Sequence, residues 1–171
     1  MIRGDSDEYE SLKKWCETLP FFSEPKSVIT CEVGVREGLG SHMIMSTILS
    51  RFEKINYIHD AIDPYGDLEY KHFDGNPTWK HGDKWTSKAP TYSNDMRDQM
   101  VKDFATNPHF KFYNMTDIQY MNVFNLSKTI YDLVFLDGPH TTQAILREAL
   151  WFAERSRKGT RIIIDDYRLC N

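Results

Sequence analysis

Short apolar runs alternate with longer segments of helical periodicity along most of the chain. Five apolar runs predict buried strands, at 28–35, 55–62, 110–114, 131–136 and 160–164. Apolar residues at helical spacing predict helices at 7–19, 42–52, 92–106, 118–126 and 141–155. Strands that alternate with helices form parallel sheets with right-handed crossovers. The pattern therefore predicts an α/β fold with a doubly wound, mainly parallel sheet.

The segment from about 65 to 90 breaks this alternation. It combines Gly, Pro and Asp turn formers with the aromatic residues Tyr65, Tyr70, Phe73, Trp79 and Trp85. A loop of this length in a compact domain is usually functional or disordered, and its aromatic content argues against disorder. We interpret it as an irregular insertion in a single domain, 1–171, that acts as a lid or faces the substrate. The aromatic side chains could equally anchor it to its own domain or to a second copy in a homodimer.

Composition excludes several classes of function. A chain of 171 residues fits one domain, and a net charge of −4, from 21 basic and 25 acidic residues, does not attract nucleic acid or anionic membranes. No apolar run approaches the ~18 residues of a membrane span, and the amino terminus has no apolar signal-peptide core. We therefore expect a soluble, cytoplasmic protein. Its cysteines, Cys16, Cys31 and Cys170, form no C-x-x-C pair, which favours reduced thiols over disulfides or a zinc site.

Residues 29–41 (I-T-C-E-V-G-V-R-E-G-L-G-S) join the first predicted strand to a buried helix through three glycines. Glycines let the backbone turn tightly and approach a ligand, and the helix start adds free N–H donors. A dinucleotide fingerprint reads G-x-G-x-x-G, whereas Gly34, Gly38 and Gly40 read G-x-x-x-G-x-G. The spacing indicates a cofactor loop of another kind. The alternative is a strand-turn-helix junction that binds no ligand.

An acidic residue precedes this loop. Glu32 would repel a pyrophosphate but could accept hydrogen bonds from an ammonium or hydroxyl group. Here the sequence resembles the class I S-adenosylmethionine-dependent methyltransferases, and more narrowly the small-molecule O-methyltransferases whose first motif reads E-x-G-x-x-x-G-x-S. Glu32, Gly34 and Gly38 match that motif, while Gly40 stands in the place of its Ser and Ser41 follows one position later. The resemblance implies a Rossmann-like sheet and S-adenosylmethionine as the cofactor bound by these five residues.

Two acids after later strands extend the expected cofactor site. Asp63 ends the second predicted strand, where an acid can accept hydrogen bonds from ribose hydroxyls in a doubly wound fold. The alternative is that Asp63-Pro64 only starts a turn. Asp117 follows the third predicted strand, where the resemblance implies a residue near the adenine ring. Asp117 is therefore expected to accept a hydrogen bond from the adenine amino group.

Three further carboxylates end the fourth and fifth predicted strands. Asp137 follows the run Y-D-L-V-F-L, and Asp165 and Asp166 follow I-I-I. If these two strands are neighbours, the three side chains lie at one edge of the sheet, where their charges repel one another unless protons or a cation neutralise them. A hard divalent ion such as Mg²⁺ prefers oxygen ligands of this kind. The three aspartates are therefore candidate metal ligands.

The resemblance strengthens this metal site. Metal-dependent O-methyltransferases have an Asp after the fourth strand and an Asp-Asn or Asp-Asp pair after the fifth, and I-D-D-Y is similar to the sugar-modifying members, macrocin and aminocoumarin O-methyltransferases. Catechol-type members have a Lys three residues after the first Asp, and His140 occupies that position here. An unperturbed imidazole has a pKa near 6.5, which suits a general base. We therefore expect Asp137 and His140 to be catalytic. The alternative for His140 is a turn residue that caps the next helix.

The resemblance spans about residues 26–167, and class I methyltransferases continue through two further strands. The expected fold therefore lacks those last two strands. Together these features predict an S-adenosylmethionine-dependent, metal-assisted methyl transfer to a hydroxyl of a small molecule, such as a sugar or a phenol. One alternative is a truncated, non-catalytic cofactor-binding or interaction domain. Another is an NAD-dependent oxidoreductase, which the glycine spacing disfavours.

Overall fold

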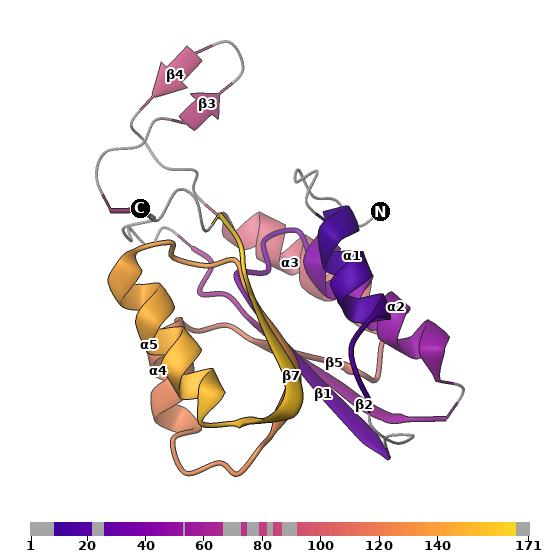
Figure 1. Cartoon of the computed structure of the whole chain (residues 1–171). Helices are drawn as coiled ribbons and strands as arrows, with labels where there is room; N and C mark the ends of the chain where they lie inside the picture. The colour runs from indigo at the N-terminus through magenta and orange to yellow at the C-terminus, as the bar shows by residue number, and fades with distance from the viewer. Residues whose placement is uncertain are drawn as a thin grey trace.

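The computed structural model describes residues 9–21, 26–52, 54–66, 73–74, 79–81, 84–86 and 92–166. Its central sheet has five parallel strands in the order β5-β2-β1-β6-β7 (Figure 1). These strands are β1 (Ser27–Val33), β2 (Asn56–Ile62), β5 (Phe110–Tyr113), β6 (Tyr131–Leu136) and β7 (Ser156–Ile164). The predicted α/β fold with a doubly wound parallel sheet is confirmed.

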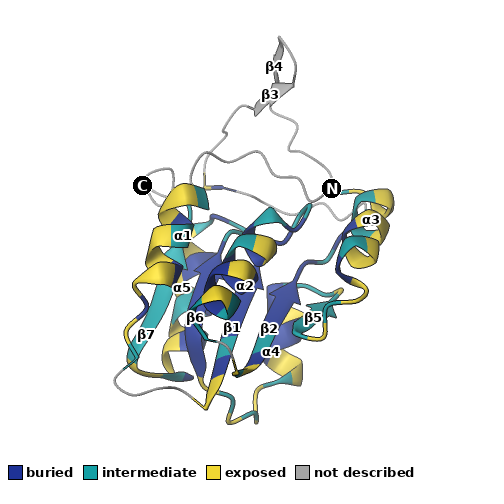
Figure 2. Cartoon of the chain, turned by 90° about the vertical axis from the view of Figure 1, so that its right-hand side faces the viewer, coloured by how far each residue is buried: buried dark blue, intermediate teal, exposed yellow. Residues whose placement is uncertain are grey.

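Helices cover both faces of the sheet (Figures 1 and 2). They are α1 (Tyr9–Glu17), α2 (Leu39–Arg51), α3 (Asn94–Phe104), α4 (Asp117–Val123) and α5 (Thr142–Ala153). The first three bury apolar side chains such as Leu12, Ile44 and Phe104 on one face, whereas α4 and α5 pack Tyr120 and Phe152 on the other. None of these helices is long and apolar enough to cross a membrane.

Alternation along β1 and β2 divides residues between the two faces. Val28 on β1 and Tyr57 on β2 belong to the core under α1, α2 and α3, whereas Cys31 and Ile62 belong to the core under α4 and α5. Both strands are almost fully buried at their carboxyl ends (Figure 2). Cys16 and Cys31 are free, buried thiols, and Cys170 lies outside the described residues.

The last strand is longer than the sequence predicts. The sequence predicts this strand from 160, but β7 begins at Ser156, and its register with β6 shifts between the Tyr131 and Leu133 pairings. The Thr160 hydroxyl accepts a hydrogen bond from Arg157 N–H at 2.9 Å and donates one to the Tyr131 carbonyl at 2.7 Å. Residues 157–159 therefore form an irregularity inside the strand.

Two short parts of the predicted insertion are described. Strands β3 (Trp79–His81) and β4 (Lys84–Thr86) form an antiparallel pair separate from the main sheet (Figure 1). Phe73 and Asp74 lie against the turn between β6 and α5. The other aromatic positions of the insertion, apart from Tyr65 and the backbone of Trp79 and Trp85, fall outside the described residues.

Candidate active site at the carboxyl ends of the strands

The glycine loop between β1 and α2 packs directly on the end of β6. Gly34 has a φ of +89°, and a Cβ atom built there would lie 2.1 Å from the Asp137 carbonyl oxygen. Gly38, with a φ of +87°, is the N-cap of α2, and a Cβ there would lie 2.6 Å from the Phe104 ring. Only glycine fits these two positions. The predicted cofactor loop and the predicted metal ligand Asp137 therefore meet at one rim of the sheet.

The side chain of Glu32 lies beneath the start of α2. It is 1% exposed, and its Oε2 atom accepts a hydrogen bond from the Ser41 hydroxyl. A Cβ at Gly40 would lie 2.0 Å from Glu32 Oε1, which explains the glycine in a position that the resemblance assigns to Ser. The first turn of α2 has no acidic residue and Gly38 provides no side-chain cap. Glu32 therefore supplies the negative charge that a helix N-terminus favours.

Asp63 ties the end of β2 to the glycine loop. Its Oδ2 atom accepts hydrogen bonds from the backbone N–H groups of Val35 at 2.9 Å and Arg36 at 3.0 Å, and its Oδ1 atom accepts one from Tyr65 N–H at 3.2 Å. Burial raises the pKa of this carboxyl, and the three N–H donors act in the opposite direction. Asp63 does more than start a turn, because it fixes the loop that carries Gly34. Its binding of ribose stays a prediction.

The structure brings Asp137, Asp165, Asp166 and His140 together where β6 and β7 end. The two strands are neighbours, and Asp165 N–H donates to the Leu136 carbonyl at 3.0 Å. Burial and the adjacent Asp165 carboxylate raise the pKa of Asp137 to about 10. His140 Nε2 lies 3.7 Å from Asp137 Oδ1 and 4.0 Å from Asp166 Oδ2. Within the described part of the chain, no three His, Cys, Asp or Glu side chains have the geometry of a metal site.

His140 is buried under an aromatic ring from the insertion. The Phe73 ring stacks on its imidazole, with centroids 5.0 Å apart and planes 18° apart. Thr141 is the N-cap of α5, accepting a hydrogen bond from Ala144 N–H, and the Asp74 carboxylate accepts another from Thr142 N–H at 2.9 Å. Capping of α5 is therefore done by Thr141 and Asp74, so the alternative role of His140 as the helix cap is wrong.

Asp117 faces α5. It begins α4 after the capping box of Thr116, and its Oδ2 atom accepts a hydrogen bond from Arg147 Nη2 at 2.5 Å. Glu148 lies nearby and is 1% exposed, and neither of its oxygens has a hydrogen-bond partner among the described residues. Burial, followed by the Asp117 carboxylate, raises the pKa of Glu148 to about 9, whereas Arg147 lowers it. The predicted contact of Asp117 with adenine remains a prediction.

Three further buried or half-buried polar residues lie outside the predicted site: Arg147 and Glu148 on α5, and His59 on β2. Helical periodicity places Arg147 and Glu148 on α5 but does not show which strand ends the helix faces. A signal for His59 was present, because His59 and Asp60 are polar residues in an otherwise apolar strand. Buried polar residues of this kind need partners within the protein.

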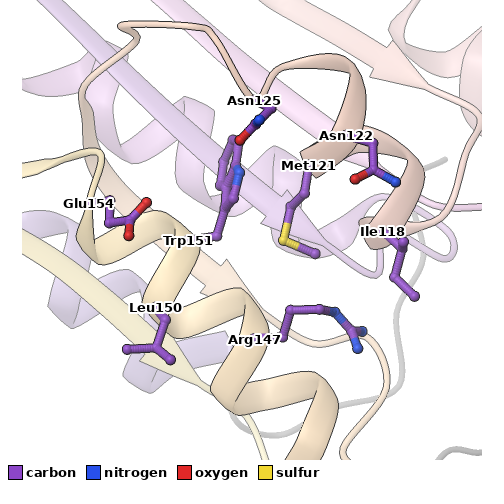
Figure 3. A pocket seen from close by; sticks show the side chains of 8 residues that line it. All are labelled: Ile118, Met121, Asn122, Asn125, Arg147, Leu150, Trp151 and Glu154. Carbon is purple, nitrogen blue, oxygen red and sulfur yellow. The ribbon is translucent and has the colours of Figure 1, made fainter.

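A groove of about 370 Å³ lies between α4 and α5 (Figure 3). Met121 and Trp151 point into it from opposite helices, and Arg147 borders it next to its partner Asp117. None of its lining residues belongs to the glycine loop or to the group of Asp137, Asp165, Asp166 and His140. The groove is therefore separate from the rim where Gly34 meets Asp137.

The strand order, the glycine loop after β1, the acid Glu32 near the end of β1 and the acid Asp63 after β2 define a class I methyltransferase domain. Residues 31–167 match the family described as Methyltransferase domain, and the chain belongs to that family. This confirms the predicted methyltransferase class and supports S-adenosylmethionine as the cofactor. No curated protein matches the sequence significantly.

Two solved structures share the fold. The O-methyltransferase NovP has a TM-score of 0.61 and 13% identity, and the match covers 95% of this chain and 66% of NovP. CalS11, described as a calicheamicin methyltransferase, has a TM-score of 0.50 and 15% identity, with 93% and 62% covered. At these identities the likeness shows the fold alone. The chain spans slightly less than two thirds of the length of either protein.

Proposed function

We propose that this chain is an S-adenosylmethionine-dependent O-methyltransferase domain that acts on a hydroxyl group of a small molecule, such as a sugar or a phenol. The observation that carries the proposal is the contact between Gly34 and the backbone of Asp137. This contact brings together two parts of the rim. One is the glycine loop, which is suited to the cofactor, and the other is the group of Asp137, Asp165, Asp166 and His140, which is suited to chemistry on a hydroxyl. A methyl donor and its acceptor oxygen must meet within a few ångströms, and this rim would allow it.

The residues around the glycine loop fit the proposed cofactor. Gly34, Gly38 and Gly40 keep side chains out of the loop, and the buried carboxylates of Glu32 and Asp63 lie beneath it. Glu32 and Ser41 would face the amino-acid end of the cofactor, Asp63 the ribose and Asp117 the adenine. The bound cofactor supplies an electrophilic methyl group on a sulfonium, so the protein contributes position and charge.

Asp137, Asp165 and Asp166 would hold a divalent cation such as Mg²⁺. All three offer oxygen ligands, and burial together with the neighbouring Asp165 carboxylate raises the pKa of Asp137 to about 10, as expected for crowded carboxylates without a cation. A cation held by these carboxylates would supply Lewis-acid chemistry that orients an acceptor hydroxyl.

His140 would accept the proton that the acceptor hydroxyl loses. The carboxyl groups of Asp137 and Asp166, at 3.7 and 4.0 Å from Nε2, would stabilise the imidazolium that forms. Stacking against Phe73 fixes the plane of the ring. Phe73 would therefore border the acceptor side of the site.

Calorimetric titration tests the cofactor first. We expect the chain to bind S-adenosylmethionine and S-adenosylhomocysteine but not NAD. Binding of NAD alone would favour an oxidoreductase. Binding of both sulfur nucleosides without release of S-adenosylhomocysteine from a panel of sugars and phenols would favour a binding domain without turnover.

Titration with Mg²⁺ tests the metal. We expect binding to release about one proton, which the dependence of the enthalpy on buffer ionisation reports. Asp165→Ala should abolish Mg²⁺ binding and leave the affinity for S-adenosylhomocysteine unchanged. Asp98→Ala, on the exposed side of α3, is the matched control and should bind Mg²⁺ like the wild type. Loss of cofactor affinity in Asp165→Ala would instead give Asp165 a structural role.

A further inference from the structure

Five polar side chains form a continuous hydrogen-bonded chain beneath the glycine loop. The Tyr57 and Thr30 hydroxyls are 2.8 Å apart, Thr30 Oγ1 lies 2.7 Å from His59 Nδ1, and His59 Nε2 lies 2.9 Å from Ser41 Oγ. Ser41 then donates to Glu32. All five are at most 2% exposed. They meet because Thr30 and Glu32, two residues apart, lie on the same face of β1, and Thr30 is paired with His59 on β2.

The number of available protons fixes the direction in which these five side chains donate their hydrogen bonds. The Ser41 hydroxyl has a single proton and donates it to Glu32, so His59 Nε2 carries a proton and donates to Ser41 Oγ. In a neutral imidazole Nδ1 is then an acceptor, which receives the proton of Thr30. Thr30 in turn accepts from Tyr57. Every group donates once toward Glu32, which ends the chain as an ionised carboxylate.

The opposite direction is less favourable. It requires a proton on Glu32, after which each hydrogen bond reverses and the last donor is the Tyr57 hydroxyl. Among the described residues the Tyr57 hydroxyl bonds only to Thr30, so its proton would have no acceptor in the buried core. A buried donor without an acceptor is destabilising. The hydrogen bonds that run from Tyr57 to Ser41 therefore favour Glu32 as a carboxylate that accepts from Ser41.

The same hydrogen bonds also fix the position of the Glu32 carboxylate. His59 Nε2 is 3.8 Å from Glu32 Oε2, and Ser41 holds that oxygen from the α2 side. The other oxygen, Oε1, lies against Gly40, where a Cβ would clash. The carboxylate is thus held on both sides beneath the glycine loop. In a buried setting a fixed negative charge acts strongly on a nearby cation, even without direct contact.

We propose that His59 is a positioning residue that acts through Ser41 to hold Glu32 as an oriented carboxylate, which selects ligands with an ammonium group at the glycine loop. This inference rests on the proposed function, because it assigns Glu32 to the amino-acid end of the cofactor. It adds that the selectivity depends on a histidine that does not contact the cofactor.

Two ligands that differ by the amino-acid half test it. S-adenosylhomocysteine carries the ammonium group, whereas 5′-methylthioadenosine lacks it. In His59→Leu we expect the affinity for S-adenosylhomocysteine to fall about tenfold or more, the range for a lost hydrogen bond near a charge, while the affinity for 5′-methylthioadenosine changes less than about twofold. His59→Gln keeps an N–H donor for Ser41 and should restore much of the difference between the two ligands.

His109→Leu is the matched control, since among the described residues the His109 imidazole hydrogen-bonds only to the backbone carbonyl of Tyr57, at 3.0 Å. It should bind both ligands like the wild type. If His59→Leu does not fold, Thr30→Val provides the test, because it removes the donor to His59 Nδ1 and should lower the affinity for S-adenosylhomocysteine alone. Equal losses for both ligands in the folded variants would overturn the inference. Failure of the wild type to bind either ligand would instead overturn the proposed function.

Discussion

Replacing Glu148 with Gln should stabilise the protein at neutral and alkaline pH. Glu148 lies on α5 with 1% of its surface exposed and no hydrogen-bond partner for either oxygen among the described residues. Burial and Asp117 raise its pKa from 4.5 to about 9. The group therefore stays protonated in the folded state at pH 7, whereas in the unfolded chain it ionises. Gln has nearly the same shape and no proton to lose.

The sign and size of the effect follow from proton linkage. Between pH 4.5 and about 9 the folded state binds the Glu148 proton and the unfolded state does not, so stability falls as the pH rises through this range. Each pH unit corresponds to about 1.4 kcal/mol, which gives a loss of about 3 kcal/mol by pH 7 relative to pH 4.5. Above the folded pKa the loss is complete. Glu148→Gln should remove this pH dependence.

Urea unfolding at pH 5, 7 and 9 measures this pH dependence of the free energy of unfolding. We expect the free energy of unfolding of the variant and the wild type to be similar at pH 5 and to separate in favour of the variant by about 2–4 kcal/mol at pH 7. Asp137, whose pKa is also raised, contributes the same slope to both proteins and cancels in the comparison. Glu154→Gln, on the exposed end of the same helix, is the control and should follow the wild type. Parallel curves for Glu148→Gln and the wild type would refute the reasoning.

Two further substitutions test the glycine loop. Gly34→Ala places a Cβ 2.1 Å from the Asp137 carbonyl oxygen, whereas at Gly66, which also has a positive φ, a Cβ would make only an ordinary contact with Asn94 Oδ1 at 3.6 Å. By urea unfolding, Gly34→Ala should lose about 1–3 kcal/mol more than Gly66→Ala, and equal losses would refute the contact. Asp63→Ala leaves two buried N–H groups of the loop without acceptors and should lose about 2–4 kcal/mol, while Asp63→Asn keeps one acceptor oxygen and should lose less than half as much, also by urea unfolding.

The order of strands and helices could be predicted because its signal is local. Apolar runs and helical spacing depend on neighbours a few residues apart, and each predicted strand is present. The boundaries were less accurate where tertiary contacts decide them. The first helix after the glycines begins at Leu39, three residues before the predicted start, since Gly38 serves as its N-cap. The last strand begins at Ser156 and not at the predicted 160, and inside it the Thr160 hydroxyl donates a hydrogen bond to the Tyr131 carbonyl.

The partners of the site residues could not be predicted, because they depend on which elements meet in space. The position of Asp117 after a strand was clear, but its pairing with Arg147 depends on how α5 packs beside α4. The stacking of Phe73 on His140 joins residues far apart in the sequence. Periodicity assigns each residue to an element and a face, yet it carries no information on contacts between faces.

The glycine motif shows why a sequence signal can be correct for an incomplete reason. The motif predicts space for a ligand at its glycines, but in the structure each glycine makes room for another part of the protein. Gly34 accommodates the Asp137 backbone, Gly38 the ring of Phe104, and Gly40 the carboxylate of Glu32. These contacts, together with the bonds from the loop to Asp63, fix the backbone of the loop before any ligand binds. A loop held in this way would lose little conformational entropy on binding the proposed cofactor, so the glycines that internal packing requires would also serve ligand recognition.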